Sequence, residues 1–171
     1  MIKLGFLSLL LVSSFASAEE ARRANAHVHG LNNLSMVISQ NQVAVNYEMP
    51  IVQLFDDHDE HEGHDDHDEL TVSDESLAEF NKYSQLFTFP KGAGCNLTSF
   101  ESGLHSVSTE GDHKDVELSY EFACSNPDQL KSITINAFDR FSELETLNFE
   151  AVINNKALSK SLKSDVNKVM F

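Results

Sequence analysis

The sequence has little positive charge. It contains 12 Lys and Arg against 27 Asp and Glu, and its formal net charge is −15 at pH 7 with the histidines neutral. A chain of this charge repels nucleic acid and anionic membrane surfaces, and it favours cations or basic partners. We therefore exclude nucleic-acid binding as a function class.

The sequence also lacks an apolar run of the roughly 20 residues that a membrane-spanning helix needs. Its most apolar stretch lies at the N-terminus, where Lys3 precedes the apolar residues 4–12 and Ala16-Ser17-Ala18 follow. A basic start, a short apolar segment and an A-x-A site are typical of a cleaved secretory signal peptide. We predict a signal peptide over residues 1–18 and an exported, soluble mature chain that does not insert into the membrane.

Only two cysteines are present, Cys95 and Cys124. An exported protein meets an oxidising environment, so this pair is expected to form one disulfide. Closing a loop of this length stabilises a fold by roughly 3–4 kcal/mol. The alternative is that both thiolates bind zinc, but the C-x-x-C spacing typical of zinc sites is missing.

Sequence motifs of common hydrolases are absent. The chain has no H-E-x-x-H and no G-x-S-x-G, and His61-Glu62-Gly63-His64 is one residue short of the first of these. We find no nucleophile beside a base. The sequence therefore predicts a protein that is not an enzyme, and a zinc hydrolase with an open coordination position is the less favoured alternative.

One stretch concentrates carboxylates and histidines. Residues 56–69 read DDHDEHEGHDDHDE and contain no apolar side chain, which predicts a solvated, flexible loop. Imidazoles are largely neutral at pH 7 and bind Zn²⁺, Ni²⁺ and Cu²⁺, and the carboxylates raise the local cation concentration. Four histidines at three-residue intervals therefore indicate a metal-binding loop. They are His58, His61, His64 and His67.

A second set of histidines lies outside this loop. In an extended strand, His27 and His29 point to the same side, about 6–7 Å apart, so both can reach one tetrahedral ion. His113 and Asp115 offer a similar pair at the start of a predicted strand. The pattern predicts an ordered metal site, whereas His105 has no partner at a suggestive spacing and is expected to be structural.

Alternation of apolar and polar residues predicts a mainly β (α+β) fold. Residues 34–38 and 43–49 alternate on either side of Gln40-Asn41, as expected of a β-hairpin in an N-terminal lobe over residues 19–55. The His-rich loop then covers residues 56–70. Ser73 is a good N-cap for a linking helix over residues 73–89, and residues 91–171 resemble antiparallel β structure. We expect two small antiparallel β lobes joined by one α-helix.

The order of these features resembles the ZrgA-type, zinc-regulated periplasmic zinc-binding proteins of Gram-negative bacteria. The resemblance covers nearly all of the mature chain, with an acidic His-rich insertion between the first motif and the others. The motifs are His27 to Gly30, Leu86 to Pro90, Cys95, His113 to Asp115, Tyr120 to Pro127 and Phe138 to Phe141. One segment departs from the family pattern, because Leu54 to His58 replaces an apolar-Gly-aromatic-acid-His segment, so His58 fits either the ordered site or the loop.

The resemblance implies a periplasmic protein that captures or buffers Zn²⁺ and supports an uptake system that includes a membrane transporter. It implies that His27, His29 and His113 are ligands of the ordered site, with Asp115 as a further candidate. The residues alone do not separate Zn²⁺ from Cu²⁺ or Ni²⁺. The alternative function is an acidic exported interaction module that binds a basic protein, with metal binding incidental.

Overall fold

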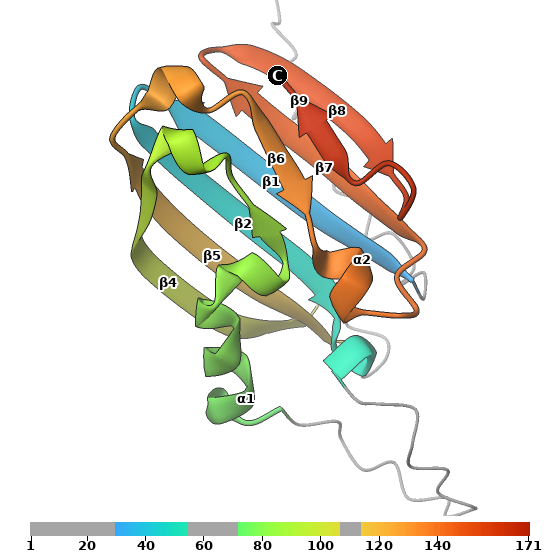
Figure 1. Ribbon diagram of the computed structural model, residues 1–171. Coiled ribbons are helices and arrows are strands. Elements are labelled where there is room, and N and C mark those ends of the chain that lie inside the picture. The colour runs from blue at the N-terminus through green and yellow to red at the C-terminus, as the bar shows by residue number, and fades with distance from the viewer. Residues whose placement is uncertain (1–29, 55–71, 107–113) are drawn as a thin grey trace, which may run out of the picture.

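The computed structural model describes residues 30–54, 72–106 and 114–171. Most of the chain in these ranges forms two β-sheets, so the predicted mainly β class is confirmed (Figure 1). The predicted His-rich loop lies outside the described residues.

The larger sheet has six strands in the order β4-β5-β2-β1-β7-β8. Its strands are β1 (Leu31–Ser39), β2 (Gln42–Pro50), β4 (Cys95–Ser106), β5 (Lys114–Cys124), β7 (Thr146–Ile153) and β8 (Lys156–Leu162). The predicted hairpin forms as β1 and β2, with Gln40 in the left-handed region at φ 56°. A second tight turn, Asn154-Asn155, joins β7 to β8, and both asparagines have positive φ, which this residue type tolerates well.

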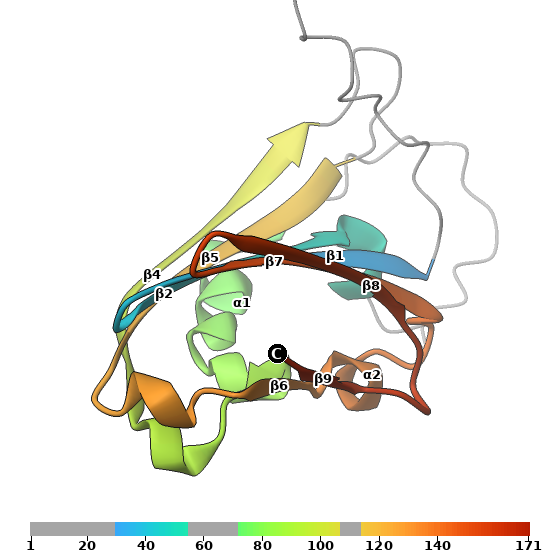
Figure 2. The same ribbon diagram turned by 90° about the horizontal axis from the view of Figure 1, so that it is seen from above.

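The smaller sheet has three strands in the order β3-β6-β9. These are β3 (Phe87–Thr88), β6 (Ser132–Ile135) and β9 (Lys168–Met170). The helices are α1 (Asp74–Ala78) and α2 (Ala137–Arg140), with 3-10 turns η1 (Ile51–Leu54), η2 (Glu79–Asn81), η3 (Tyr83–Gln85), η4 (Lys91–Ala93) and η5 (Pro127–Gln129). Figure 2 shows the small sheet, α1 and α2 on the same face of the large sheet, which leaves its opposite face uncovered by them.

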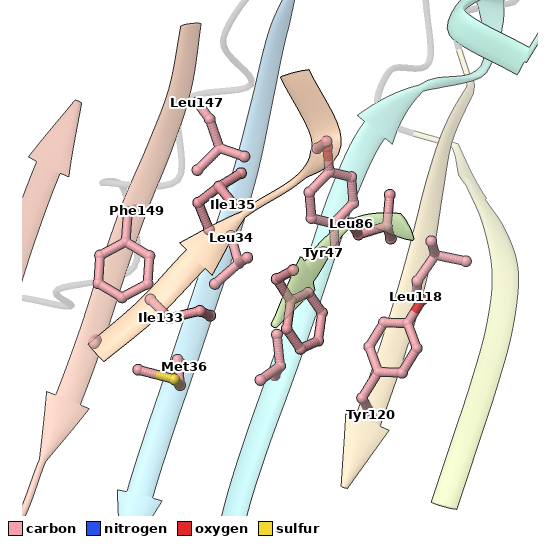
Figure 3. Close-up of a cluster of buried hydrophobic side chains, with 14 of the residues drawn as sticks. Leu34, Met36, Tyr47, Leu86, Leu118, Tyr120, Ile133, Ile135, Leu147 and Phe149 are labelled. Atoms are coloured by element: carbon pink, nitrogen blue, oxygen red, sulfur yellow. The ribbon is translucent and has the colours of Figure 1, made fainter. Parts of the chain in front are cut away.

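The core lies between the two sheets and follows from the alternation in the sequence. Inward-facing Leu34, Met36 and Tyr47 of the large sheet are at most 1% exposed, and Ile133 and Ile135 pack from the small sheet (Figure 3). Polar residues between them on β1 and β2 face the uncovered side. Burying one face of each sheet is what fixes the register of these strands.

The sequence predicted two separate β lobes, but the N-terminal hairpin and the C-terminal strands share one six-stranded sheet. The N-terminal hairpin is central in the large sheet, because β2 pairs with β5 and β1 pairs with β7. The β1–β7 pair is parallel, whereas the sequence pattern predicted only antiparallel strands. The reason is that β7 is reached from β6 of the other sheet through α2, so no hairpin turn sets its direction.

The helix expected over residues 73–89 is also shorter than predicted. Ser73 caps α1 as expected, accepting a hydrogen bond at its Oγ from the Ser76 backbone N–H at 3.1 Å. After Ala78 the chain continues as 3-10 turns that bring aromatic rings onto the sheet, such as Tyr83 against Phe122 at 4.8 Å between ring centroids. Packing of these rings overrides the weak preference of the segment for a continuous helix.

The predicted disulfide between Cys95 and Cys124 is present. The two cysteines lie directly opposite each other in the β4–β5 ladder. Both sulfurs are therefore bonded to each other, and the alternative of two thiolate zinc ligands is wrong.

Candidate metal centre

Of the residues predicted to bind metal, only Asp115 lies within the described part of the chain. The predicted histidine ligands His27, His29, His58, His61, His64, His67 and His113 all lie outside it. Within residues 30–54, 72–106 and 114–171, no group of three or more His, Cys, Asp or Glu side chains is placed to hold a metal ion. The candidate site can therefore be described only through the strand ends that adjoin the histidine-bearing segments.

These strand ends meet at one end of the large sheet. Gly30, which follows the His27 and His29 segment, leads into β1, and β5 begins at Lys114 directly after His113. Pro50, at the end of β2, lies opposite Asp115 of β5 in the ladder. The chain then passes through η1 toward the His-rich segment, so all three histidine-bearing segments join the sheet at this end (Figure 1).

Gly30 fixes where the first segment enters the sheet. Its carbonyl oxygen accepts hydrogen bonds from the backbone N–H groups of Glu145 and Thr146, at 2.9 and 3.0 Å. Its φ is +81°, and a Cβ at this position would lie 2.7 Å from the carbonyl oxygen of Glu143. Only glycine accepts both the positive φ and the close backbone approach without strain. The glycine of the H-x-H-G motif thus has a structural role beside the two histidines.

Asp115 lies on the uncovered face of the large sheet but is only 6% exposed. Its neighbours in the ladder are Pro50 of β2 and His105 of β4. From histidine spacing alone, His105 was predicted to have no partner. Its backbone lies opposite Asp115 only because of the register in which β4 and β5 pair, and this register cannot be read from spacing. The structure thus brings together two residues that the sequence treated separately.

Two further carboxylates follow on the same face. Glu117 lies two residues after Asp115 on β5, directly opposite Glu48 of β2. The Asn46 amide donates a hydrogen bond at 2.5 Å to the Glu117 carboxylate. Like charges in directly opposed positions are unfavourable in a sheet, and the hydrogen bond from Asn46 offsets part of this cost at Glu117.

A buried polar pair on the opposite face was not predicted. Asn32 and Tyr47 are both 0% exposed, and the Asn32 amide donates a hydrogen bond at 2.5 Å to the Tyr47 hydroxyl oxygen. Burial raises the pKa of Tyr47 above the ordinary value of a tyrosine, so this phenol stays protonated at neutral pH and is a poor metal ligand. The available signal was that Asn32 occupies an inward position of the alternating β1 strand.

The disulfide lies far from this end of the sheet. Cys124 is at the opposite end of β5 from Asp115, which corresponds to roughly 30 Å along an extended strand. The cysteines therefore stabilise β4 and β5 without taking part in the candidate centre.

Comparison with protein families identifies a family whose model covers most of the chain. The family described as ZrgA family zinc uptake protein matches residues 26–171, which includes all described strands and the His-rich segment. A comparison with curated proteins found no match. Among the described helices, none is long and apolar enough to cross a membrane.

Proposed function

Because the chain belongs to the ZrgA family of zinc uptake proteins, we propose that it is a periplasmic protein that binds Zn²⁺ and buffers or delivers it to a membrane transporter. Its role in zinc uptake follows from the family. Zinc binding by its own residues, the periplasmic location and the non-enzymatic nature of its action are parts of the proposal.

One observation carries the proposal. The strand ends that adjoin the segments of His27 and His29, of His113 and of the His-rich loop lie at the same end of one sheet. The strand ends that anchor these segments are thereby held at one end of the sheet, which lowers the entropy cost of assembling a shared site. Without this convergence, the histidines would be separate surface residues.

The residue types suit the cargo. Neutral imidazole and carboxylate oxygen are common zinc ligands, and structural zinc sites take four of them. We propose that His27, His29 and His113 form the tighter site, with Asp115 as the fourth ligand or as the partner that orients a histidine. The acidic pair Glu48 and Glu117 on the same face adds favourable potential for an approaching cation.

The His-rich loop has a different proposed role. A flexible segment must become ordered around an ion, so its affinity is lower than that of a site held by strand ends. We propose that His58, His61, His64 and His67 capture zinc at higher concentrations and that the ordered site sets the affinity at low concentrations.

Calorimetric titration of Zn²⁺ into the metal-stripped mature protein tests this division. We expect one tight site and several weaker ones, with the weaker ones lost when residues 56–69 are deleted. The double variant His27→Ala, His29→Ala should lose the tight site and keep the weaker ones. Parallel titrations of Asp115→Asn and His105→Ala measure what the opposed pair in the β4–β5 ladder contributes.

The loop deletion also tests the structural interpretation. Its residues include no apolar side chain, so the melting temperature of the metal-free protein should be unchanged within about 2 °C. A large loss of stability would show that the segment is part of the core. A tight site that survives the double histidine substitution would overturn the ligand assignment.

A further inference from the structure

Among the described residues, no strand pairs with the outer side of the edge strand β4. β4 and β8 are the two edges of the large sheet, and within the described ranges β4 pairs only with β5. An edge strand with open N–H and C=O groups can pair with a strand of another chain.

The register identifies which residues of β4 offer these groups. The Cys124 N–H of β5 donates to the Asn41 carbonyl on the β2 side, at 2.8 Å. Because hydrogen-bonding directions alternate along an antiparallel ladder, Tyr120 and Leu118 also direct their backbone groups toward β2. Their β4 partners are Phe100 and Ser102, whose N–H and C=O groups therefore point away from the sheet. Leu104 continues this series.

The two edges of the sheet are protected differently. β8 carries the exposed lysines Lys156 and Lys160, and lysine on an edge strand discourages pairing with another strand. From Ser99 to Ser106, β4 has no lysine and no proline. A Cβ at Gly103 would meet no atom within 4 Å. By sequence, β4 is therefore the less protected edge of the two.

The side chains along β4 define the chemistry of a partner strand. On the uncovered face, Glu101 of β4 lies opposite Ser119 of β5, and Glu117 and Glu121 occupy the two diagonal positions on β5. A strand added to the β4 edge therefore meets the Glu101 carboxylate directly, with two more carboxylates one strand further in. On the other face, Leu104 is 40% exposed and Phe100 is half-buried, with Ser102 between them. A complementary strand places basic side chains on the first face and apolar side chains on the second, and these faces alternate along a strand.

We propose that the β4 edge binds an extended segment of a partner protein in which basic and apolar residues alternate. Pairing of β4 with a second copy of itself is disfavoured, because it brings Glu101 and its acidic neighbours close to the same residues of the other copy in a chain of net charge −15. The proposal does not depend on zinc binding by the histidines.

Fluorescence anisotropy with a labelled, end-capped peptide of alternating lysine and valine tests the proposal. The titration is made with the full mature protein in EDTA, so that metal has no part in it. We expect saturable binding that weakens as salt is raised. The variant Ser102→Pro removes an N–H that points outward, a change that edge strands tolerate, and should weaken binding by about tenfold or more.

Three controls separate strand addition from general attraction to an acidic protein. Ser159→Pro makes the equivalent change on the β8 edge and should leave binding unchanged. A peptide of the same composition with all lysines preceding all valines has the same charge but no alternation, and should bind at least about tenfold more weakly. A peptide N-methylated at alternate residues tests the backbone hydrogen bonds without altering the protein.

The following results would overturn the proposed strand addition at the β4 edge. Equal binding to the wild type and to a folded Ser102→Pro variant would overturn the proposal, as would equal binding of the alternating and block peptides. If Ser102→Pro does not fold, as judged by circular dichroism, unchanged affinity for the N-methylated peptide would overturn it. Self-association of the wild type that Ser102→Pro abolishes would identify a second copy as the occupant and overturn the choice of a basic partner.

Discussion

Gly30 is the residue at which the histidine motif joins the sheet, and its conformation makes it sensitive to substitution. Its φ is +81°, and an added Cβ would lie 2.7 Å from the Glu143 carbonyl oxygen, so Gly30→Ala introduces backbone strain and a steric overlap. We expect a loss of about 1–3 kcal/mol in the free energy of unfolding, measured by urea denaturation. The tight zinc site should weaken as well, because the segment of His27 and His29 would enter the sheet differently.

Gly103→Ala is the matched control for this variant. A Cβ there meets nothing within 4 Å, and Gly103 lies in a strand without a positive φ. Replacing glycine by alanine at such a position reduces the entropy of the unfolded chain and should leave stability unchanged or raise it by up to about 1 kcal/mol. Equal losses at both glycines would contradict the role assigned to Gly30.

The buried pair of Asn32 and Tyr47 supports a second residue-level prediction. Tyr47→Phe removes the hydroxyl that accepts the hydrogen bond from Asn32, and both residues are 0% exposed. An amide left without a partner in the core costs about 1–3 kcal/mol, measured by urea unfolding. The double variant Asn32→Leu, Tyr47→Phe should be more stable than Tyr47→Phe alone, because no buried polar group is then left unpaired. A double variant that is less stable would show that packing outweighs the hydrogen bond.

At the scale of elements, the sequence correctly predicted the features that depend on neighbouring residues, such as turns and helix caps. The β1–β2 hairpin and the Ser73 cap depend on residues close together in the chain, and both are confirmed. The central position of the hairpin depends on the β2–β5 and β1–β7 pairs, whose paired residues are more than 60 positions apart in the chain. Periodicity shows which face of a strand is buried, but it does not show which strand lies beside it.

The β4–β5 pair contains the disulfide, and its removal gives a prediction that separates stability from zinc binding. Cys95→Ala, Cys124→Ala should lower the free energy of unfolding by about 3–4 kcal/mol, because the unfolded chain regains the entropy of an open loop. The tight zinc site should be retained in the folded variant, since Cys124 and Asp115 are at opposite ends of β5. Urea denaturation and zinc calorimetry on the same preparation measure the two effects. Loss of zinc binding in a variant that still folds would contradict the conclusion that the cysteines lie far from the zinc site.

At the scale of the whole molecule, the candidate site could be predicted only in part. Residue types and spacing pointed to His27, His29 and the His-rich loop, since imidazole chemistry is visible in a sequence. That Pro50, Asp115 and His105 lie side by side could not be predicted, because it follows from the pairing of three strands. Asn32 was missed for a related reason, since its partner Tyr47 lies on another strand.

If zinc binds the folded chain at strand ends that exist only after folding, then zinc must stabilise the whole fold. Binding to the native state alone adds about 2.7 kcal/mol when free zinc is 100 times its dissociation constant. For a chain of this size, that corresponds to a rise of about 5–10 °C in the melting temperature, measured by differential scanning calorimetry.

The same measurement on variants assigns the effect to the ordered site. Because the His-rich segment holds no apolar residue, zinc bound there should stabilise the fold much less, so deletion of residues 56–69 should keep most of the rise. The variant His27→Ala, His29→Ala should lose most of it, and Mg²⁺ at equal concentration should produce little change, because it prefers oxygen ligands. A rise that disappears with the loop and persists without His27 and His29 would move the main zinc site from the strand ends to the loop.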